Sequence, residues 1–153
     1  MLYRELRILP RPSPPFPEKI VCVGYHVVHA GEHRYEERPN VEGEAARLAA
    51  DVTGAAQLQS SRARVWRYPP HTRGRRHADH AQEEVFVVVS GTLTMLLGDP
   101  PERFDLPPTS VAAVEPMTPL QVRNESDGEL VLFIYGAPPE QAGADFYDDP
   151  GPL

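Results

Sequence analysis

The chain has 153 residues, with 22 acidic against 15 basic side chains and a formal net charge of −7 at pH 7. This length predicts a single domain, residues 1–153, with one hydrophobic core. The acidic balance argues against a nucleic-acid partner, because binding a phosphate backbone requires a basic stripe. The nearest feature to such a stripe is a local patch made of Arg62, Arg64, Arg73, Arg75 and Arg76.

Cysteine content and the N-terminal residues indicate the cellular compartment in which we expect the protein. Cys22 is the only cysteine, so one chain cannot build a disulfide framework or a cysteine-based zinc site. That usage fits a reducing cytoplasm, where we expect the protein. Charges occupy the N-terminus where a secretory signal needs apolar residues, and no stretch reaches transmembrane length. We therefore expect no membrane partner.

The first 61 residues are predicted to form strands and one helix that pack against a barrel core made of residues 62–139. Residues 3–9 predict a first strand, and residues 19–30, rich in Val, Ile and Tyr, predict a second. Residues 10–17 between them are rich in proline and predict an extended connector. We interpret this connector as an arm packed on the barrel or on a partner subunit.

One helix is predicted, over residues 40–53. Its apolar positions recur at helical spacing and form a single stripe, consisting of Val41, Ala45, Leu48 and Val52. Asn40 is a suitable N-cap, and Gly54 is a suitable residue to end the helix. We expect this helix to pack on a sheet and to carry no site.

From residue 62 onward, short strands alternate with turns at intervals of about 8–12 residues, which is typical of a sandwich or barrel. The predicted strands are residues 64–68, 84–89, 92–97, 103–106, 110–114, 120–123 and 129–135. The run at residues 84–89 is almost continuously apolar, which predicts that both of its faces are covered. The acidic tail at residues 143–153 is expected to be loosely held.

A cluster of polar side chains precedes the strand at residues 84–89. Side chains two residues apart share a face of a strand, so His77 and Asp79 are predicted to point one way and His80 the other. With Glu84 they offer imidazole and carboxylate donors that suit Fe, Mn, Ni or Zn. The alternative is a polar rim, solvated or hydrogen-bonded to nearby arginines. From spacing alone we favour the rim over the metal site.

This stretch resembles the first motif of the cupin family, which runs Gly, five residues, His-x-His, three or four residues, Glu, six residues, Gly. Glu84 and Gly91 match its second half. With the four-residue spacer, His77 takes the first histidine position and Asp79 the second. With the three-residue spacer, His80 is the second histidine and the first position has none. We prefer the four-residue spacer, because it keeps a histidine in the leading position.

The second cupin motif is similar to residues 109–124. Asn124 matches it, Pro116 lies one place beyond the family's proline, and the family's histidine falls on Leu120. The resemblance covers residues 62–139. It implies an all-β fold, a double-stranded β-helix or jelly-roll barrel, with one short flanking helix.

The resemblance also implies a degenerate metal site. The family's metal ligands, three histidines and one glutamate, would correspond here to His77, Asp79, Leu120 and Glu84. One ligand is changed, and one is lost because leucine cannot coordinate a metal. A divalent transition metal would then depend on His77, Asp79 and Glu84, with His80 as a substitute if the register shifts. Leu120 and Phe86 are expected on the wall of the pocket.

Three kinds of function remain open. We favour a small-molecule binder whose barrel has lost much of its metal site, because of Leu120. The alternative is a metal-dependent enzyme of the isomerase, oxygenase or decarboxylase type, acting on a small polar substrate. A structural protein with an empty barrel is the third. Cupins are commonly dimers, and we expect a homodimer, since one helix cannot cover all the apolar strand surface.

Overall fold

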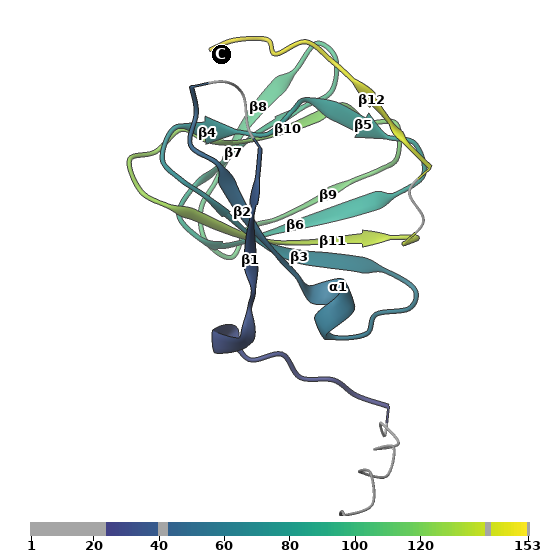
Figure 1. Cartoon of the computed structure of the whole chain (residues 1–153). Coiled ribbons are helices and arrows are strands. Elements are labelled where there is room, and N and C mark those ends of the chain that lie inside the picture. The colour runs from purple at the N-terminus through teal and green to yellow at the C-terminus, as the bar shows by residue number, and fades with distance from the viewer. Residues whose placement is uncertain (1–23, 40–42, 140–141, 153) are drawn as a thin grey trace, which may run out of the picture.

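The computed structural model describes residues 24–39, 43–139 and 142–152. The strands form two antiparallel sheets that face each other and together make a jelly-roll barrel (Figure 1). The double-stranded β-helix implied by the cupin resemblance is therefore confirmed.

The first sheet has the strand order β1-β2-β3-β11-β6-β9. Its strands are β1 (Tyr35–Arg38), β2 (Arg47–Asp51), β3 (Arg62–Tyr68), β11 (Leu130–Ala137), β6 (Glu83–Ser90) and β9 (Val111–Val114). The second sheet has the order β12-β5-β10-β7-β8, with β4 also paired to β10. Its strands are β12 (Ala144–Phe146), β5 (His77–Asp79), β10 (Leu120–Asn124), β7 (Leu93–Leu97), β8 (Glu102–Leu106) and β4 (Thr72–Arg73).

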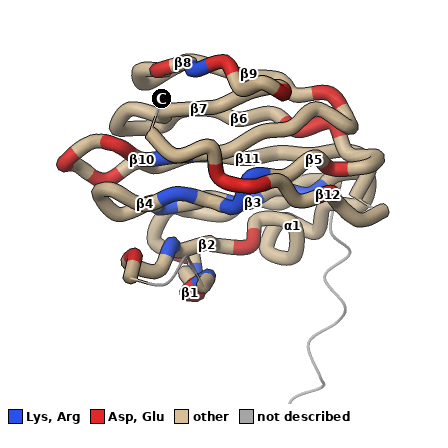
Figure 2. Tube along the Cα trace, turned by 90° about the horizontal axis from the view of Figure 1, so that it is seen from above, with Lys and Arg blue, Asp and Glu red and all other residues tan. Residues whose placement is uncertain are grey.

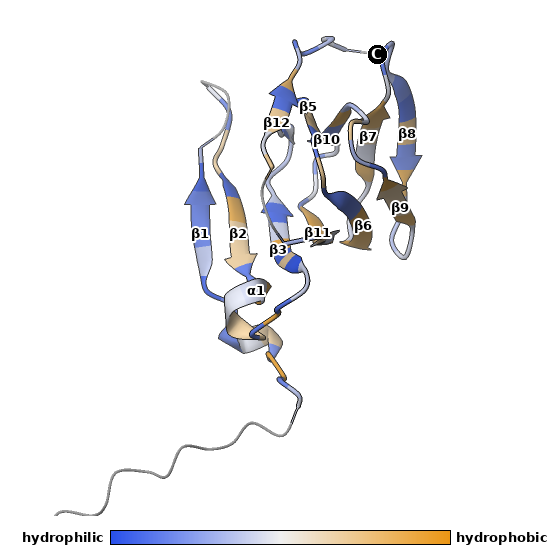
Figure 3. Ribbon diagram, turned by 90° about the vertical axis from the view of Figure 1, so that its right-hand side faces the viewer, coloured by the Kyte–Doolittle hydropathy of each residue, from blue (hydrophilic) through white to orange (hydrophobic). Residues whose placement is uncertain are grey.

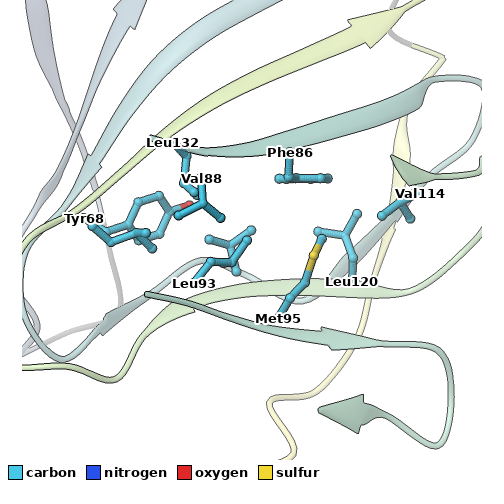
Figure 4. Close-up of a cluster of buried hydrophobic side chains, with 10 residues drawn as sticks. Tyr68, Phe86, Val88, Leu93, Met95, Val114, Leu120 and Leu132 are labelled. Atoms are coloured by element: carbon cyan, nitrogen blue, oxygen red, sulfur yellow. The ribbon is translucent and has the colours of Figure 1, made fainter. Parts of the chain in front are cut away.

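The core lies between the two sheets, where alternate side chains of each strand point inward (Figure 4). Its buried members are Tyr68, Phe86, Val88, Leu93, Met95, Val114, Leu120, Val122, Leu130 and Leu132. Burying one such aliphatic or aromatic side chain contributes about 1.5–3 kcal/mol. This layer is therefore the main source of the barrel's stability, and it forms the floor on which the site is built.

Strand β6 is covered on one face only, so the prediction of two covered faces for residues 84–89 is wrong. Phe86 and Val88 are buried in the core, whereas Val85 and Val87 on the other face are half-buried and Val89 is 55% exposed. Figure 3 colours β6 and β9 by the hydropathy of each residue, with hydrophobic residues in orange. An antiparallel sheet needs only one buried face, and a run of valines hides this difference in the sequence.

The predicted helix at residues 40–53 is also wrong, apart from its end. Residues 47–51 form β2, which pairs with β1 and with β3 in the first sheet. Only α1 (Val52–Ala55) is helical, and Asp51 caps it by accepting a hydrogen bond from the Gly54 N–H at 3.2 Å. Pairing on both edges satisfies the β2 backbone and outweighs the helical spacing of the apolar residues. Asn40 lies outside the described residues.

The N-terminal strand predictions are tested only in part. Residues 1–23, which include the predicted strand at 3–9 and the proline-rich connector, lie outside the described residues. Residues 24–29 do not form the predicted strand; they lead into a 3-10 turn, η1 (Ala30–Glu32). Tyr25 and Val27 are largely exposed, so their β propensity meets no sheet edge here.

Within the described ranges, no helix is both long and apolar enough to cross a membrane.

The acidic tail is held on the barrel, contrary to the expectation that it is loose. Its strand β12 pairs with β5, and Asp149 accepts a hydrogen bond from Arg123 at 2.9 Å. The Arg123 side chain is only 3% exposed, and its guanidinium also donates to the Gly151 carbonyl. A buried guanidinium requires acceptors, and the acidic tail supplies them. The tail thereby becomes one wall of the site.

Candidate functional site

A cavity of about 330 Å³ opens between the two sheets. Its polar lining residues are Arg47, Arg62, Arg64, Arg75, His77, Asp79, Gln82 and Glu84. Its apolar lining includes Trp66, Tyr68, Phe86, Leu120, Val122, Ile134 and Phe146. The volume lies at the lower end of the range of about 300–1,000 Å³ typical of small-molecule sites.

Strand periodicity explains which side chains reach the cavity. On β3, Arg62, Arg64 and Trp66 alternate with residues of the outer face and all line the cavity. On β6 the same alternation places Glu84 beside the buried Phe86. The two sheets thus contribute different chemistry. The first sheet supplies arginines, aromatic rings and a carboxylate. The second sheet supplies His77 and Asp79 of β5 and the apolar side chains Leu120 and Val122 of β10.

His77, Asp79 and Glu84 all line this one cavity. The His77 Nε2 atom lies 3.9 Å from Glu84 Oε2, which is too long for a hydrogen bond, and His77 Nδ1 lies 3.0 Å from the Arg75 carbonyl oxygen. Asp79 has a local role as well. Its Oδ1 accepts hydrogen bonds from the backbone N–H groups of Ala81 and Gln82, at 3.1 and 2.9 Å. Asp79 therefore fixes the turn between β5 and β6.

His80 is not part of the cavity lining. Its Nε2 lies 2.9 Å from Asp145 Oδ1 on β12, and this hydrogen bond raises the pKa of His80, with a smaller opposing effect of burial. His80 thus connects the end of β5 to the tail. Leu120 and Phe86 both lie on the cavity wall and are buried in the core.

Glu84 has an unusual environment for a carboxylate. Its side chain is 15% exposed, and its buried Oε2 atom has no hydrogen-bond partner among the described residues. Burial raises the pKa of Glu84, while the nearby His77 lowers it, Asp79 raises it and Arg62 lowers it, in decreasing order of effect. A carboxyl with a raised pKa and an unpaired oxygen is suited to exchange a proton or a hydrogen bond with a ligand.

The donor set does not fit a resident metal ion in this arrangement. Within the described ranges, no three His, Cys, Asp or Glu side chains are grouped closely enough to hold a metal together. Leu120 offers no donor, and Asp79 is engaged by two backbone N–H groups. His77 and Glu84 alone would leave a cation with too few protein ligands, since transition-metal sites commonly use three or four.

The arginines of the cavity were missed as site residues by the sequence analysis, which grouped Arg62, Arg64 and Arg75 in a surface patch. The structure brings them together with Arg47 of β2. The signal was present in residues 62–68, where two arginines alternate with the same period as Trp66 and a tyrosine. Arg47 could not be found this way, because its segment was predicted to be helical.

Comparisons with known proteins agree with this architecture. The family model of the cupin domain matches residues 64–135. No curated protein sequence matches the chain.

Solved structures resemble the chain in fold. A Klebsiella pneumoniae protein with a double-stranded β-helix domain is 18% identical, with a TM-score of 0.63 over 80% of this chain and 97% of its own. A sugar phosphate isomerase of the cupin superfamily from Silicibacter pomeroyi is 18% identical, with a TM-score of 0.59 over 78% and 92%. A predicted oxalate decarboxylase from Thermotoga maritima is 14% identical, with a TM-score of 0.63 over 72% and 97%. At these identities the likeness concerns the fold alone.

Proposed function

Since this chain belongs to the cupin family, we propose that its barrel binds a small organic molecule in the cavity between the sheets, without requiring a metal ion. The observation that carries the proposal is the cavity of about 330 Å³, walled by aromatic rings and by polar side chains that converge from both sheets. Sites of this kind combine apolar walls, which contact the carbon skeleton of a ligand, with a few polar groups that fix its orientation.

The proposal gives each part of the cavity a role. Trp66, Phe86 and Leu120 contact the apolar portion of the ligand. Glu84 offers its unpaired Oε2 atom to a polar group of the ligand, and His77 stands beside it. Because burial raises the pKa of Glu84, this carboxyl can carry a proton and donate a hydrogen bond to a ligand oxygen.

Trp66 provides a direct test, because it is the only tryptophan of the chain and it lines the cavity. Its fluorescence is titrated with a panel of small neutral and charged organic molecules on chelator-treated protein. We expect a saturable change in emission for at least one compound. Ile134→Phe, which narrows the cavity, should lower the affinity for that compound about tenfold, a change of about 1.4 kcal/mol in binding free energy. Val131→Phe, on the opposite face of β11, is the matched control and should have little effect.

The alternative is a metal-dependent cupin enzyme of the isomerase, oxygenase or decarboxylase type. It is favoured by the approach of His77 to Glu84 in the cavity. Metal analysis of protein purified without chelator or histidine tag separates the two functions. A metal content far below one ion per chain, with a melting temperature that chelator does not change, supports the metal-free small-molecule binder. One Fe, Mn, Ni or Zn per chain, required for the Trp66 response, supports the enzyme and contradicts the metal-free proposal.

We also propose that the chain forms a homodimer through the outer face of the first sheet. On this face Val87 is directly opposite Val111 of β9 and Phe133 of β11, while Val85 is opposite Tyr135. Val89, Val111 and Tyr135 are exposed. A contiguous apolar face of this kind is typical of a surface that is covered by another protein. A second copy would cover it by a two-fold contact of like faces.

A further inference from the structure

We propose that the molecule held in the cavity is an anion, and that its carboxylate or phosphate group is bound by Arg62 and Arg64 of β3 together with Arg47 of β2 and Arg75. This inference rests on the proposed function of the barrel as a small-molecule site and names the chemical class of its ligand.

The first argument is the charge of the cavity. The chain as a whole carries a formal net charge of −7. The cavity lining has the opposite balance, with four arginines against two carboxylates, an excess of two positive charges when His77 is neutral. Basic positions along β3 are visible in Figure 2. A positive cavity with low-dielectric walls in an acidic protein attracts anions selectively, because the walls focus its field.

The second argument is that Arg62 and Arg64 have no ion-pair partner in the part of the chain that the structure describes. Neither forms an ion pair or a side-chain hydrogen bond with any residue of the described ranges, although Arg62 lies near enough to Glu84 to influence its pKa. Arg67 on the outer face of the same strand is different, since its Nη2 atom lies 2.7 Å from Glu129 Oε1. Among the described residues, the structure thus gives an ion pair to the β3 arginine that faces away from the cavity and none to the two that face it.

The cost of this arrangement is seen at Arg64. Burial lowers the pKa of Arg64, and the charges of Arg62 and Arg38 lower it further, against the opposite influence of Asp51 and Glu36. The charged form is thus disfavoured by its surroundings. An anion bound between Arg62 and Arg64 would remove their mutual repulsion and offset part of the desolvation.

The third argument is that Arg47 and Arg75 are held in place by aromatic rings. The Arg47 guanidinium lies 5.4 Å from the Trp66 ring centre and 5.5 Å from that of Tyr68, and Nη1 donates to the Tyr68 hydroxyl at 3.3 Å. The Arg75 guanidinium lies 3.7 Å from the Phe146 ring centre. Stacking leaves the edge of a guanidinium available for a carboxylate or phosphate. The buried Arg47 Nε atom has no hydrogen-bond partner among the described residues, which leaves it an unused donor on a residue that lines this cavity.

The experiment uses the Trp66 emission of the full chain with probes matched in shape but not in charge. Glucose 6-phosphate is compared with glucose, succinate with succinamide, and inorganic phosphate is titrated alone. We expect at least one anion to bind about tenfold or more tightly than its neutral counterpart. The phosphate and succinate arms tell which oxyanion the site prefers.

Variants locate the binding group. Arg62→Gln and Arg64→Gln should each lower the affinity for the preferred anion by about tenfold or more. Arg67→Gln, on the same strand but facing outward, is the matched control and should stay within about twofold of the parent chain. Arg75→Gln, at an exposed position, tests the same site with little risk to folding. Melting curves of all four variants verify that they are folded.

Three outcomes would overturn the inference. The neutral probes could bind as tightly as the anions, the cavity variants could lose no more affinity than Arg67→Gln, or none of the anions could change the emission. If neutral members of the wider panel still bind in the last case, the small-molecule function stands and only its anionic character is wrong. If the anions bind but only with a metal added, the anion inference stands and the metal-free function is wrong.

Discussion

The imidazole of His77 and the carboxylate of Glu84 face each other across the seam between the two sheets, with Nε2 3.9 Å from Oε2. His77 lies on β5 directly opposite Leu120 of β10, whereas Glu84 is the second residue of β6. Two polar groups therefore lie beside a buried leucine, at a place where the cupin motif has histidine. At this separation the two atoms form no hydrogen bond with each other, and both side chains line the cavity.

Replacing Glu84 by glutamine is expected to stabilise the fold at neutral pH. Burial raises the pKa of Glu84 above that of the unfolded chain. A group with a raised folded-state pKa contributes stability that is fully present below the unfolded pKa and lost as the pH rises through the folded pKa. Above its unfolded pKa the parent chain loses this contribution progressively, while Glu84→Gln stays neutral. The variant should therefore melt higher near pH 7, and the advantage should vanish near about pH 4.

Melting curves from acidic to neutral pH check this prediction. Glu83→Gln is the matched control, since Glu83 is the neighbouring residue and is exposed. Its melting temperature should follow that of the parent chain at every pH. A Glu84→Gln variant that is less stable than the parent chain at pH 7 would mean that ionised Glu84 has a favourable partner in solution.

The tail prediction concerns Asp149. Burial opposes ionisation of Asp149, but the Gly151 N–H, the Gln121 amide and the charges of Arg123 and Arg73 together lower its pKa. The stability that ionised Asp149 contributes to the fold is therefore present above its unfolded pKa and lost as the pH falls through its folded pKa. Asp149→Asn leaves the buried Arg123 with one charged acceptor fewer, at a cost of about 1–3 kcal/mol in the free energy of unfolding.

Urea unfolding and hydrogen exchange measure the two consequences. Residues 144–146 should exchange faster in Asp149→Asn, because β12 loses the anchor that follows it. Asp148→Asn, at an exposed neighbouring position, should behave like the parent chain. Unchanged protection of residues 144–146 would show that pairing with β5 holds the tail without Asp149.

The sequence predicts the barrel better than it predicts the site. Strand rhythm predicts a sandwich or barrel, because alternation and turn residues are local signals, and the cupin resemblance at Glu84 to Gly91 implies the double-stranded β-helix. The strand β2 is missed, since its pairing with β3 depends on residues far away in the chain. The same distance hides part of the cavity lining. Arg47 reaches the cavity through that pairing, and Phe146 reaches it through the pairing of β12 with β5, followed by an anchor on the buried Arg123.

The dimer prediction concerns the outer face of the first sheet. Light scattering at micromolar concentration should give twice the mass of one chain. Val111→Glu places a charge in the apolar face and should shift the protein to monomer, because an unpaired charge is costly to bury. Met117→Glu, at another exposed apolar residue, is the control and should remain a dimer. A clean monomer mass for the parent chain would contradict the proposal.

The last prediction tests whether Leu120 is what separates this site from a metal centre. Leu120 and His77 are direct partners on antiparallel strands, so their side chains point to the same face, about 4.5–5.5 Å apart at Cβ. Leu120→His would therefore place a second imidazole beside His77, within reach of Glu84. We expect this variant to bind one zinc ion per chain, measured by metal analysis after dialysis. Affinity should fall below about pH 6–7, where the imidazoles gain protons.

Stability provides the second measurement for Leu120→His. Without metal the variant should lose about 1–3 kcal/mol, because a polar ring replaces a buried leucine. Zinc should restore much of this loss, since a ligand that binds only the folded state raises the melting temperature. Adding His77→Ala should abolish the zinc effect, whereas adding His80→Ala should not, because His80 lies outside the cavity and contacts Asp145. Leu132→His, buried in the same core but not lining the cavity, is the matched control and should gain no zinc. A folded Leu120→His variant that binds no zinc would show that His77 and Glu84 are not positioned to act as ligands even when the missing imidazole is supplied.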